Sequence, residues 1–130
     1  MPYFGRTSKK NLETADIRLQ RIFNEVIKYF DCSIICGHRD KESQNKVFGE
    51  GKSKLQWPHS KHNSYPSKAV DAVPYPINWE DTDRMYMFIG FVKGIATSMG
   101  YSIRTGADWD GDTLVDDQSF HDLPHFEILD

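Results

Sequence analysis

The chain contains 130 residues, of which 38% are hydrophobic and 13% aromatic, and its formal net charge is −3. This length and apolar content are sufficient for one domain, residues 1–130, with a core of its own. It has no block of lysine and arginine and no apolar run long enough to cross a bilayer, so we expect neither nucleic-acid binding nor membrane insertion. The polar segment Met1–Lys10 lacks the apolar centre of a secretory signal, so we expect synthesis in the cytoplasm.

The first predicted element is an amphipathic helix, because apolar residues recur every three or four positions from Ser8 to Phe30. Thr7 or Ser8 is its expected N-cap. Cys32 and Cys36 follow in a β-branched stretch, and in a strand their Cα atoms would lie roughly 13 Å apart, which is too far for a disulfide. We expect buried free thiols, in keeping with a reducing compartment; a metal or redox pair is the alternative.

The rest of the chain alternates short strands with helices. Short β-branched or alternating stretches bounded by glycine or proline predict strands, at Ser33–Gly37, Ala69–Val73, Tyr101–Ile103 and His125–Leu129. Three- and four-residue apolar spacing predicts a helix at Trp79–Met99, capped by Asp81 or Thr82 and closed by Gly100, and we expect a further short helix at Lys41–Phe48. Polar, glycine-containing stretches predict loops, at Gly49–Pro66 and Gly106–Ser119. This order predicts an α+β domain.

Two histidines and a carboxylate form a candidate metal-ligand set, namely His62, Asp71 and His125. Zinc accepts imidazole nitrogen and carboxylate oxygen, and three protein ligands with an open fourth position are typical of hydrolytic zinc sites. Asp122, three residues before His125, is the candidate general base. His121 is the alternative to His125 as a ligand, or a hydrogen-bonding group for the transition state.

Arg39 is a candidate catalytic and substrate-binding residue because it follows directly after a predicted strand. A guanidinium held there can bind a substrate carboxylate or stabilise a developing oxyanion. The alternative is a surface ion pair with Asp40 or Glu42. Gln44 and Ser60 are candidate hydrogen-bonding residues beside the site, although both also suit ordinary positions on a helix surface and in a loop.

Alternating carboxylates occupy the late acidic loop. Asp108, Asp110 and Asp112 surround Gly111 in a pattern similar to the start of a calcium-binding loop. The match is partial, because Ser119 stands where an EF-hand carries its bidentate glutamate. Calcium binding is therefore one hypothesis for this loop, and a solvated acidic loop is the other.

Five short blocks occur in the order found in one known family. They are Gly37-His38-Arg39…Gln44, Ser60-x-His62, Ala69-Val70-Asp71-x-x-Pro74-Tyr75, Gly106-Ala107-Asp108-Trp109 and Asp122-x-x-His125-Phe126-Glu127. Together they resemble the zinc peptidases that include D-alanyl-D-alanine carboxypeptidases and L-alanyl-D-glutamate endopeptidases. The endopeptidases of bacteriophage endolysins are the most similar branch.

The resemblance implies a small α+β domain with an antiparallel sheet flanked by helices and zinc in a surface cleft. It implies that His62, Asp71 and His125 bind zinc, that Asp122 is the catalytic base, and that Arg39 contacts substrate and stabilises its transition state. The sequence departs from the family in one spacing, since His62 and Asp71 are nine residues apart rather than seven. The inserted stretch 63–68 therefore has room to reshape a wall of the substrate site.

The function implied is hydrolysis of an amide bond in the peptide stem of peptidoglycan. L-Ala-D-Glu is the first choice of bond, and D-Ala-D-Ala is the alternative. The expected context is a monomeric phage endolysin that reaches the cell wall after holin-mediated release. Two other classes stay open: a domain that binds wall peptide without cleaving it, and a tail-associated phage component that opens the wall locally.

Overall fold

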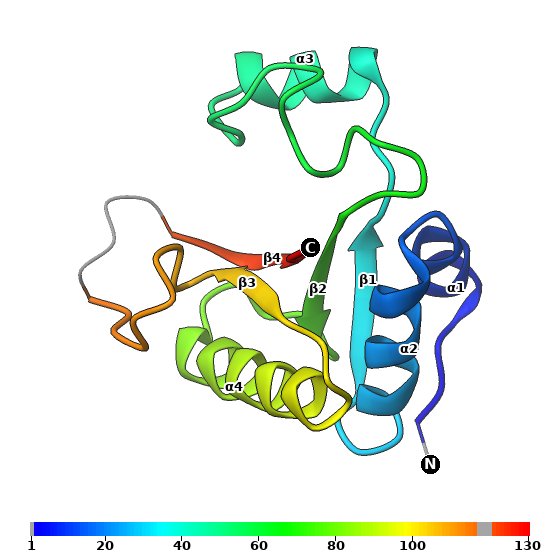
Figure 1. Ribbon diagram of the computed structural model, residues 1–130, viewed down its shortest axis with the longest axis vertical. Helices are drawn as coiled ribbons and strands as arrows, with labels where there is room; N and C mark the ends of the chain where they lie inside the picture. Colours follow the sequence, from blue (N-terminus) through cyan, green and yellow to red (C-terminus); the bar gives the residue numbers. More distant parts are fainter. Residues whose placement is uncertain (1, 117–120) are drawn as a thin grey trace.

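A computed structural model describes residues 2–116 and 121–130. Within them the chain forms α1 (Arg6–Glu13), α2 (Ile17–Val26), β1 (Cys32–Cys36), α3 (Lys41–Gly49), β2 (Ala69–Pro74), α4 (Thr82–Ser98), β3 (Ile103–Gly106) and β4 (Asp122–Ile128). The strands make one antiparallel sheet in the order β1-β2-β4-β3 (Figure 1). The predicted α+β fold is confirmed. Ser119, named above for the acidic loop, lies outside the described residues.

The predicted single N-terminal helix is wrong, because the chain forms two helices that are separated at residues 14–16. Asp16 begins α2 as its N-cap, accepting a hydrogen bond from the Arg18 backbone N–H at 2.8 Å. The backbone of Ser67 bonds to the residues between the two helices. Its N–H donates to the Thr14 carbonyl, and its carbonyl accepts from the Asp16 N–H. The apolar spacing continues across the break because both helices bury their apolar side chains in the same core.

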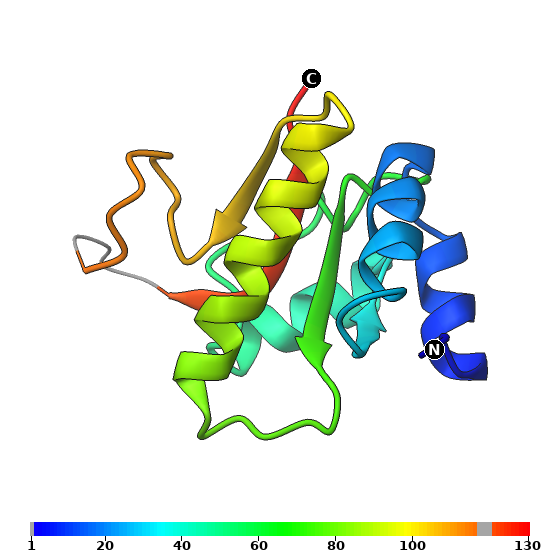
Figure 2. The same ribbon diagram turned by 90° about the horizontal axis from the view of Figure 1, so that it is seen from below.

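Helices α2 and α4 pack against each other and against the sheet (Figure 1 and Figure 2). Phe126 of β4 lies between them, edge-on to Phe23 of α2 at 5.3 Å and to Phe88 of α4 at 5.9 Å between ring centroids. Side chains alternate along a strand, so the residues flanking Phe126 and its counterpart Val70 point to the other face of the sheet. That opposite face carries Asp71, Arg104, His125 and Glu127.

Helix α3 lies beyond the end of the sheet where β1 finishes, away from α2 and α4 (Figure 1). Its Gln44 is completely buried, and the side-chain amide donates to Ser53 Oγ at 3.0 Å and to the Leu55 carbonyl at 2.6 Å. These bonds fasten the start of the long loop to α3. As predicted, residues 50–66 contain no helix or strand.

The last two strands differ from the prediction: β3 begins two residues later and β4 three residues earlier. Thr105 pairs with Phe126, but the next residue, Gly106, pairs with Asp122, so the register shifts between them. The extra residues of β4 form a bulge that contains Pro124, a residue with no N–H for the ladder. Because of this bulge, side chains of β4 point alternately to the two faces of the sheet only from His125 onward.

In the part of the chain that the structure describes, none of the helices has both the length and the apolar character needed to span a membrane.

Candidate active site

The three predicted metal ligands converge. His62 Nε2 lies 3.1 Å from Asp71 Oδ1, and His125 Nδ1 lies 3.7 Å from the same oxygen. All three ligand atoms are within 4.8 Å of one another. Ligand atoms bonded to one tetrahedral zinc at about 2.0–2.2 Å stand about 3.3–3.6 Å apart. The donor set and its spacing therefore fit a divalent metal ion.

His62 is fixed by its other ring nitrogen. Nδ1 lies 2.7 Å from the Gly37 carbonyl, which can only accept, so Nδ1 carries a hydrogen and Nε2 is the atom that faces Asp71 and is available to bind a metal ion. Gly37 itself must be glycine, because a Cβ there would overlap the Asn11 carbonyl and the Thr14 hydroxyl of the N-terminal segment. Packing of that segment against the end of β1 thus sets the orientation of a ligand.

The three predicted metal ligands have pKa values that differ from the ordinary ones. Burial raises the pKa of Asp71, but the two histidines outweigh this and hold its pKa well below the usual range. Burial lowers the pKa of His62, yet the charge and hydrogen bond of Asp71 raise it above the ordinary value. The pKa of His125 is raised in the same way, against the effect of burial. An ionised, half-buried carboxylate between two imidazoles is suited to hold a cation.

Asp122 stands next to this centre. Its Oδ2 lies 3.9 Å from His125 Nδ1, and the side chain is 30% exposed. Burial, followed by the charge of Asp71, raises the pKa of Asp122. Gly106 of β3 approaches so closely that a Cβ there would overlap the Asp122 carbonyl. Contact between β3 and the bulge therefore positions the predicted general base.

Arg39 is turned toward the centre rather than toward solvent. Its Nη2 lies 3.3 Å from Asp71 Oδ2, and its Nη1 donates to Gln44 Oε1 at 2.9 Å. The alternative of a surface ion pair with Asp40 does not describe this contact, since Asp40 caps α3 instead. Gln44 lies buried behind the guanidinium, so it contacts Arg39 and the loop after α3.

His121 does not join the ligand group. It is exposed, and its Nδ1 lies 3.1 Å from the Tyr86 hydroxyl, so His125 is the histidine that meets Asp71. Ser60 is half-buried, and its Oγ accepts from the His62 N–H at 3.2 Å. Ser60 thus supports the loop that carries His62.

Both cysteines are free, as predicted, but only Cys32 is buried. Burial raises the pKa of Cys32 to about 12. Cys36 is half-buried, and its Sγ lies 3.8 Å from His62 Nδ1 and 3.6 Å from Arg39 Nη2. The register shift at the end of β1 accompanies this position of Cys36 at the site.

A cleft of about 1390 Å³ contains these groups. Its walls come from the end of β1, from α3 and the following loop, and from β3, β4 and their connection. Its lining includes the three ligand residues and Asp122, and further Arg39, Ser60, Lys52, Lys54, Arg104, Trp109 and His121. None of the inserted residues 63–68, all of which are described, lines it. The insertion therefore does not form a wall of the cleft.

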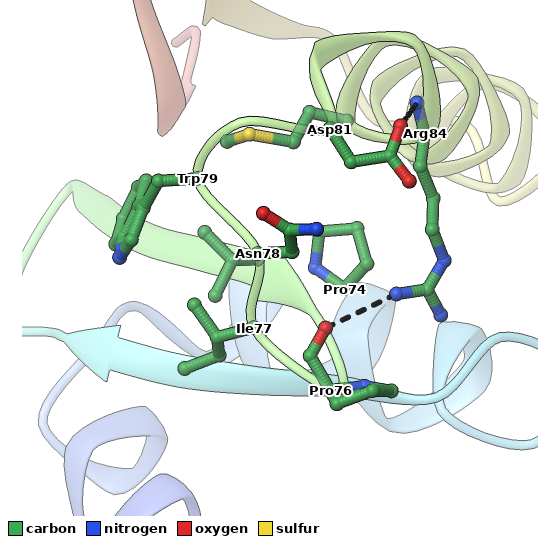
Figure 3. Close-up of a pocket in the computed structure, with 9 residues that line it drawn as sticks. Pro74, Pro76, Ile77, Asn78, Trp79, Asp81 and Arg84 are labelled. Atoms are coloured by element: carbon green, nitrogen blue, oxygen red, sulfur yellow. Dashed lines mark hydrogen bonds between the residues drawn. The ribbon is translucent and has the colours of Figure 1, made fainter.

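The loop between β2 and α4 borders the cleft on another side. The Arg84 side chain donates to the Tyr75 carbonyl at 2.8 Å. It also donates to the Pro76 carbonyl at 3.2 Å, while Asp81 caps α4 by accepting from the Arg84 N–H (Figure 3). Trp79 of this loop lines both the cleft and a small pocket of about 10 Å³ (Figure 3). The small pocket has room for about one water molecule, so the large cleft is the candidate substrate site.

The acidic loop holds a second carboxylate group. Ligand oxygens of Asp108, Asp110 and Asp112 lie within 4.8 Å of one another. Asp108 is buried; its Oδ2 accepts from the Thr113 N–H at 2.8 Å and lies 3.9 Å from Lys93 Nζ, while its buried Oδ1 has no hydrogen-bond partner. The three carboxylates that the sequence singles out are therefore close together.

Glu127 is a site residue that the sequence analysis did not assign. It is buried, and its Oε1 lies 2.8 Å from His125 Nε2. Its position in the sequence could have identified it, because a residue two places after a predicted ligand in a strand points to the same face of the sheet as that ligand.

Comparisons with known proteins found one similar solved structure and one matching family. The solved structure of the Serratia marcescens L-Ala D-Glu endopeptidase ChiX is similar, with a TM-score of 0.76 and 25% sequence identity over 98% of this chain and 91% of that chain. No curated protein matches the sequence. The family model of the phage L-alanyl-D-glutamate peptidases matches residues 2–129. The chain therefore belongs to the phage L-alanyl-D-glutamate peptidase family.

Proposed function

We propose that this protein is a zinc-dependent peptidase that hydrolyses the L-Ala-D-Glu bond in the peptide stem of peptidoglycan. The observation that carries the proposal is the convergence of His62 Nε2, Asp71 Oδ1 and His125 Nδ1 beside Asp122. Two imidazole nitrogens and one carboxylate oxygen match the ligands of hydrolytic zinc sites. Membership of the L-alanyl-D-glutamate peptidase family supports the choice of bond.

Each residue has a separate role in this reaction. His62, Asp71 and His125 hold the zinc, which when bound supplies Lewis-acid activation of a water and of the scissile carbonyl. Asp122 accepts the proton of the attacking water and delivers it to the nitrogen of the leaving amine. Its raised pKa brings this carboxylate closer to neutral pH, which favours both transfers.

Arg39 supplies fixed positive charge in the cleft. Asp71 and Gln44 hold the guanidinium from two directions, so little reorganisation is needed when negative charge develops on a substrate oxygen. We assign Arg39 to the oxyanion or to a substrate carboxylate. Ser60 lines the same cleft and is proposed to bond the substrate backbone, whereas Gln44 contributes by holding Arg39.

Mass spectrometry of purified wall fragments tests the proposal. Digestion should create new L-Ala carboxyl and D-Glu amino termini, and a chelator should prevent this until zinc is restored. Release of terminal D-Ala would favour a D-Ala-D-Ala carboxypeptidase instead. Binding of fragments with no new termini would favour a wall-binding domain.

The phage family supports a role as an endolysin. In this proposal a monomer is made in the cytoplasm and reaches the wall after holin-mediated release. The alternative is a tail-associated component with the same chemistry. Detection of the protein in purified phage particles would favour that alternative, and its restriction to the lysate would support the endolysin role.

We also propose that Asp108, Asp110 and Asp112 bind calcium. The buried, unpartnered Oδ1 of Asp108 supports this, since a cation would satisfy it together with two neighbouring carboxylates. Calorimetric titration with calcium, with magnesium as the comparison, tests the site. Asp110→Asn should weaken calcium binding while the zinc content is unchanged; equal binding by both proteins would contradict this proposal.

A further inference from the structure

Glu127, which is buried, and Arg104, which is partly exposed, form an ion pair behind His125. They are direct partners across β3 and β4, and Arg104 Nη2 donates to Glu127 Oε2 at 2.9 Å. The other carboxylate oxygen, Oε1, lies 2.8 Å from His125 Nε2. Glu127 is only 2% exposed, so water does not compete for these contacts. One carboxylate thus joins an arginine to a metal-ligand candidate.

The chemistry of this contact decides which ring nitrogen of His125 faces the metal. An ionised carboxylate can only accept hydrogen bonds, so the Nε2 atom of His125 must carry the hydrogen. The neutral ring then has its lone pair on Nδ1, the atom that lies 3.7 Å from Asp71 Oδ1. With the opposite tautomer, an N–H group would point at the metal position, and binding would be lost.

Arg104 holds the carboxylate in place, and the ion pair between Arg104 Nη2 and Glu127 Oε2 at 2.9 Å keeps Glu127 a hydrogen-bond acceptor. The Arg104 guanidinium also stands over the Trp109 ring at 5.5 Å, and that ring lies 5.1 Å from the His125 ring. Arg104 therefore contacts both groups that confine the imidazole.

We propose that Glu127 and Arg104 are positioning residues that fix the tautomer and ring orientation of His125 for metal binding. The inference rests on the proposed function, because it requires that His125 is a zinc ligand. Residues that hold a ligating histidine in this way typically change metal affinity by about 10–100-fold when they are replaced.

Zinc affinity is measured on the whole, metal-free protein by competition with a chromophoric chelator. Glu127→Leu conserves approximate volume but removes the acceptor, and it should weaken zinc binding by about 10–100-fold. Glu127→Gln keeps an acceptor oxygen, so it should weaken zinc binding less than Glu127→Leu does. Arg104→Met should give a smaller fall than Glu127→Leu, since the carboxylate itself remains.

The ion pair between Glu25 of α2 and Lys28 of the turn that follows supplies the matched control, because it also joins a carboxylate to a cation but lies away from the cleft. Glu25→Leu and Lys28→Met should leave zinc affinity unchanged. Circular dichroism of each metal-free variant checks that it is folded. Arg104 is itself 40% exposed, so Arg104→Met changes a partly exposed side chain and leaves the buried carboxylate of Glu127 in the sequence.

A spectroscopic measurement separates positioning from general support of the fold. In zinc-loaded protein, nitrogen-15 spectra of the histidine rings should show hydrogen on His125 Nε2, protected from exchange in the wild type and exposed in Glu127→Leu. Hydrogen on Nδ1 in the wild type, or equal zinc affinity in a folded Glu127→Leu variant, would overturn the inference and leave the proposed function standing. Failure of the wild type itself to bind zinc would overturn both.

Discussion

Asp71 and His125 lie directly opposite each other on the neighbouring strands β2 and β4. Residues paired in this way have Cβ atoms about 4.5–5.5 Å apart and point to the same face of the sheet. The backbone ladder alone therefore brings two of the three ligand candidates together. The third, His62, comes from a loop whose backbone is bound to the start of α3 through the Arg39 N–H and the His62 carbonyl at 2.8 Å.

Removing a ligand should abolish both metal binding and activity. His62→Ala leaves two of the three protein ligands, so we expect loss of bound zinc and of wall-fragment cleavage together. Zinc is measured by elemental analysis and cleavage by mass spectrometry. His59→Ala, which removes an exposed histidine of the same loop, is the control and should retain both. Full activity of the wild type in excess chelator would show that the metal mechanism is wrong.

Removing the base should separate binding from turnover. Asp122→Asn keeps the size of the side chain but cannot accept the proton, so kcat should fall by about 10²–10⁴ while zinc stays bound. Glu80→Gln, at an exposed position, is the control. An unchanged kcat with an intact zinc site would remove Asp122 from the proposed mechanism.

A methyl group at position 106 should disturb Asp122 through the backbone. Gly106→Ala places Cβ against the Asp122 carbonyl, so the bulge of β4 must shift. We expect the free energy of unfolding to fall by about 1–3 kcal/mol and kcat to fall with it. Urea unfolding and steady-state kinetics give the two values. Gly94→Ala in α4, where a Cβ meets nothing within 4 Å, should instead be neutral or stabilising by up to about 1 kcal/mol.

Asp16 should contribute stability that depends on pH. Hydrogen bonding from Arg18, partly opposed by burial, lowers the pKa of Asp16 from 3.8 to about 2. A lowered pKa means that the ionised form stabilises the folded state, fully above about pH 4 and progressively less as pH falls toward 2. Asp16→Asn keeps an N-capping oxygen but loses this charge. Its free energy of unfolding at pH 6 should therefore be about 2 kcal/mol lower than that of the wild type.

Chemical unfolding of Asp16→Asn and wild type at several pH values measures the difference. The gap between the two free energies of unfolding should close between about pH 4 and pH 2. A gap that stays constant across this range would mean that the substitution acts through packing or capping rather than through the charge.

The fold was largely predictable because its strands and α3 are local patterns bounded by glycine and proline. The errors arise where distant segments meet. The break between α1 and α2 depends on hydrogen bonds to Ser67, which lies far along the chain. The early start of β4 depends on pairing between Gly106 and Asp122, which no local periodicity records.

The sequence by itself determined which side chains are candidates for the chemistry, because imidazole, carboxylate and guanidinium groups, with the spacing of their motifs, are properties of the residues. Only the tertiary structure decided how they are used. Strand pairing set Asp71 against His125, and their charges and hydrogen bonds, outweighing burial, lowered the pKa of Asp71 and raised that of His125. The carbonyl of Gly37 and the carboxylate of Glu127 selected a nitrogen on each imidazole. Those choices depend on contacts between atoms brought together by folding, which spacing along a chain does not specify.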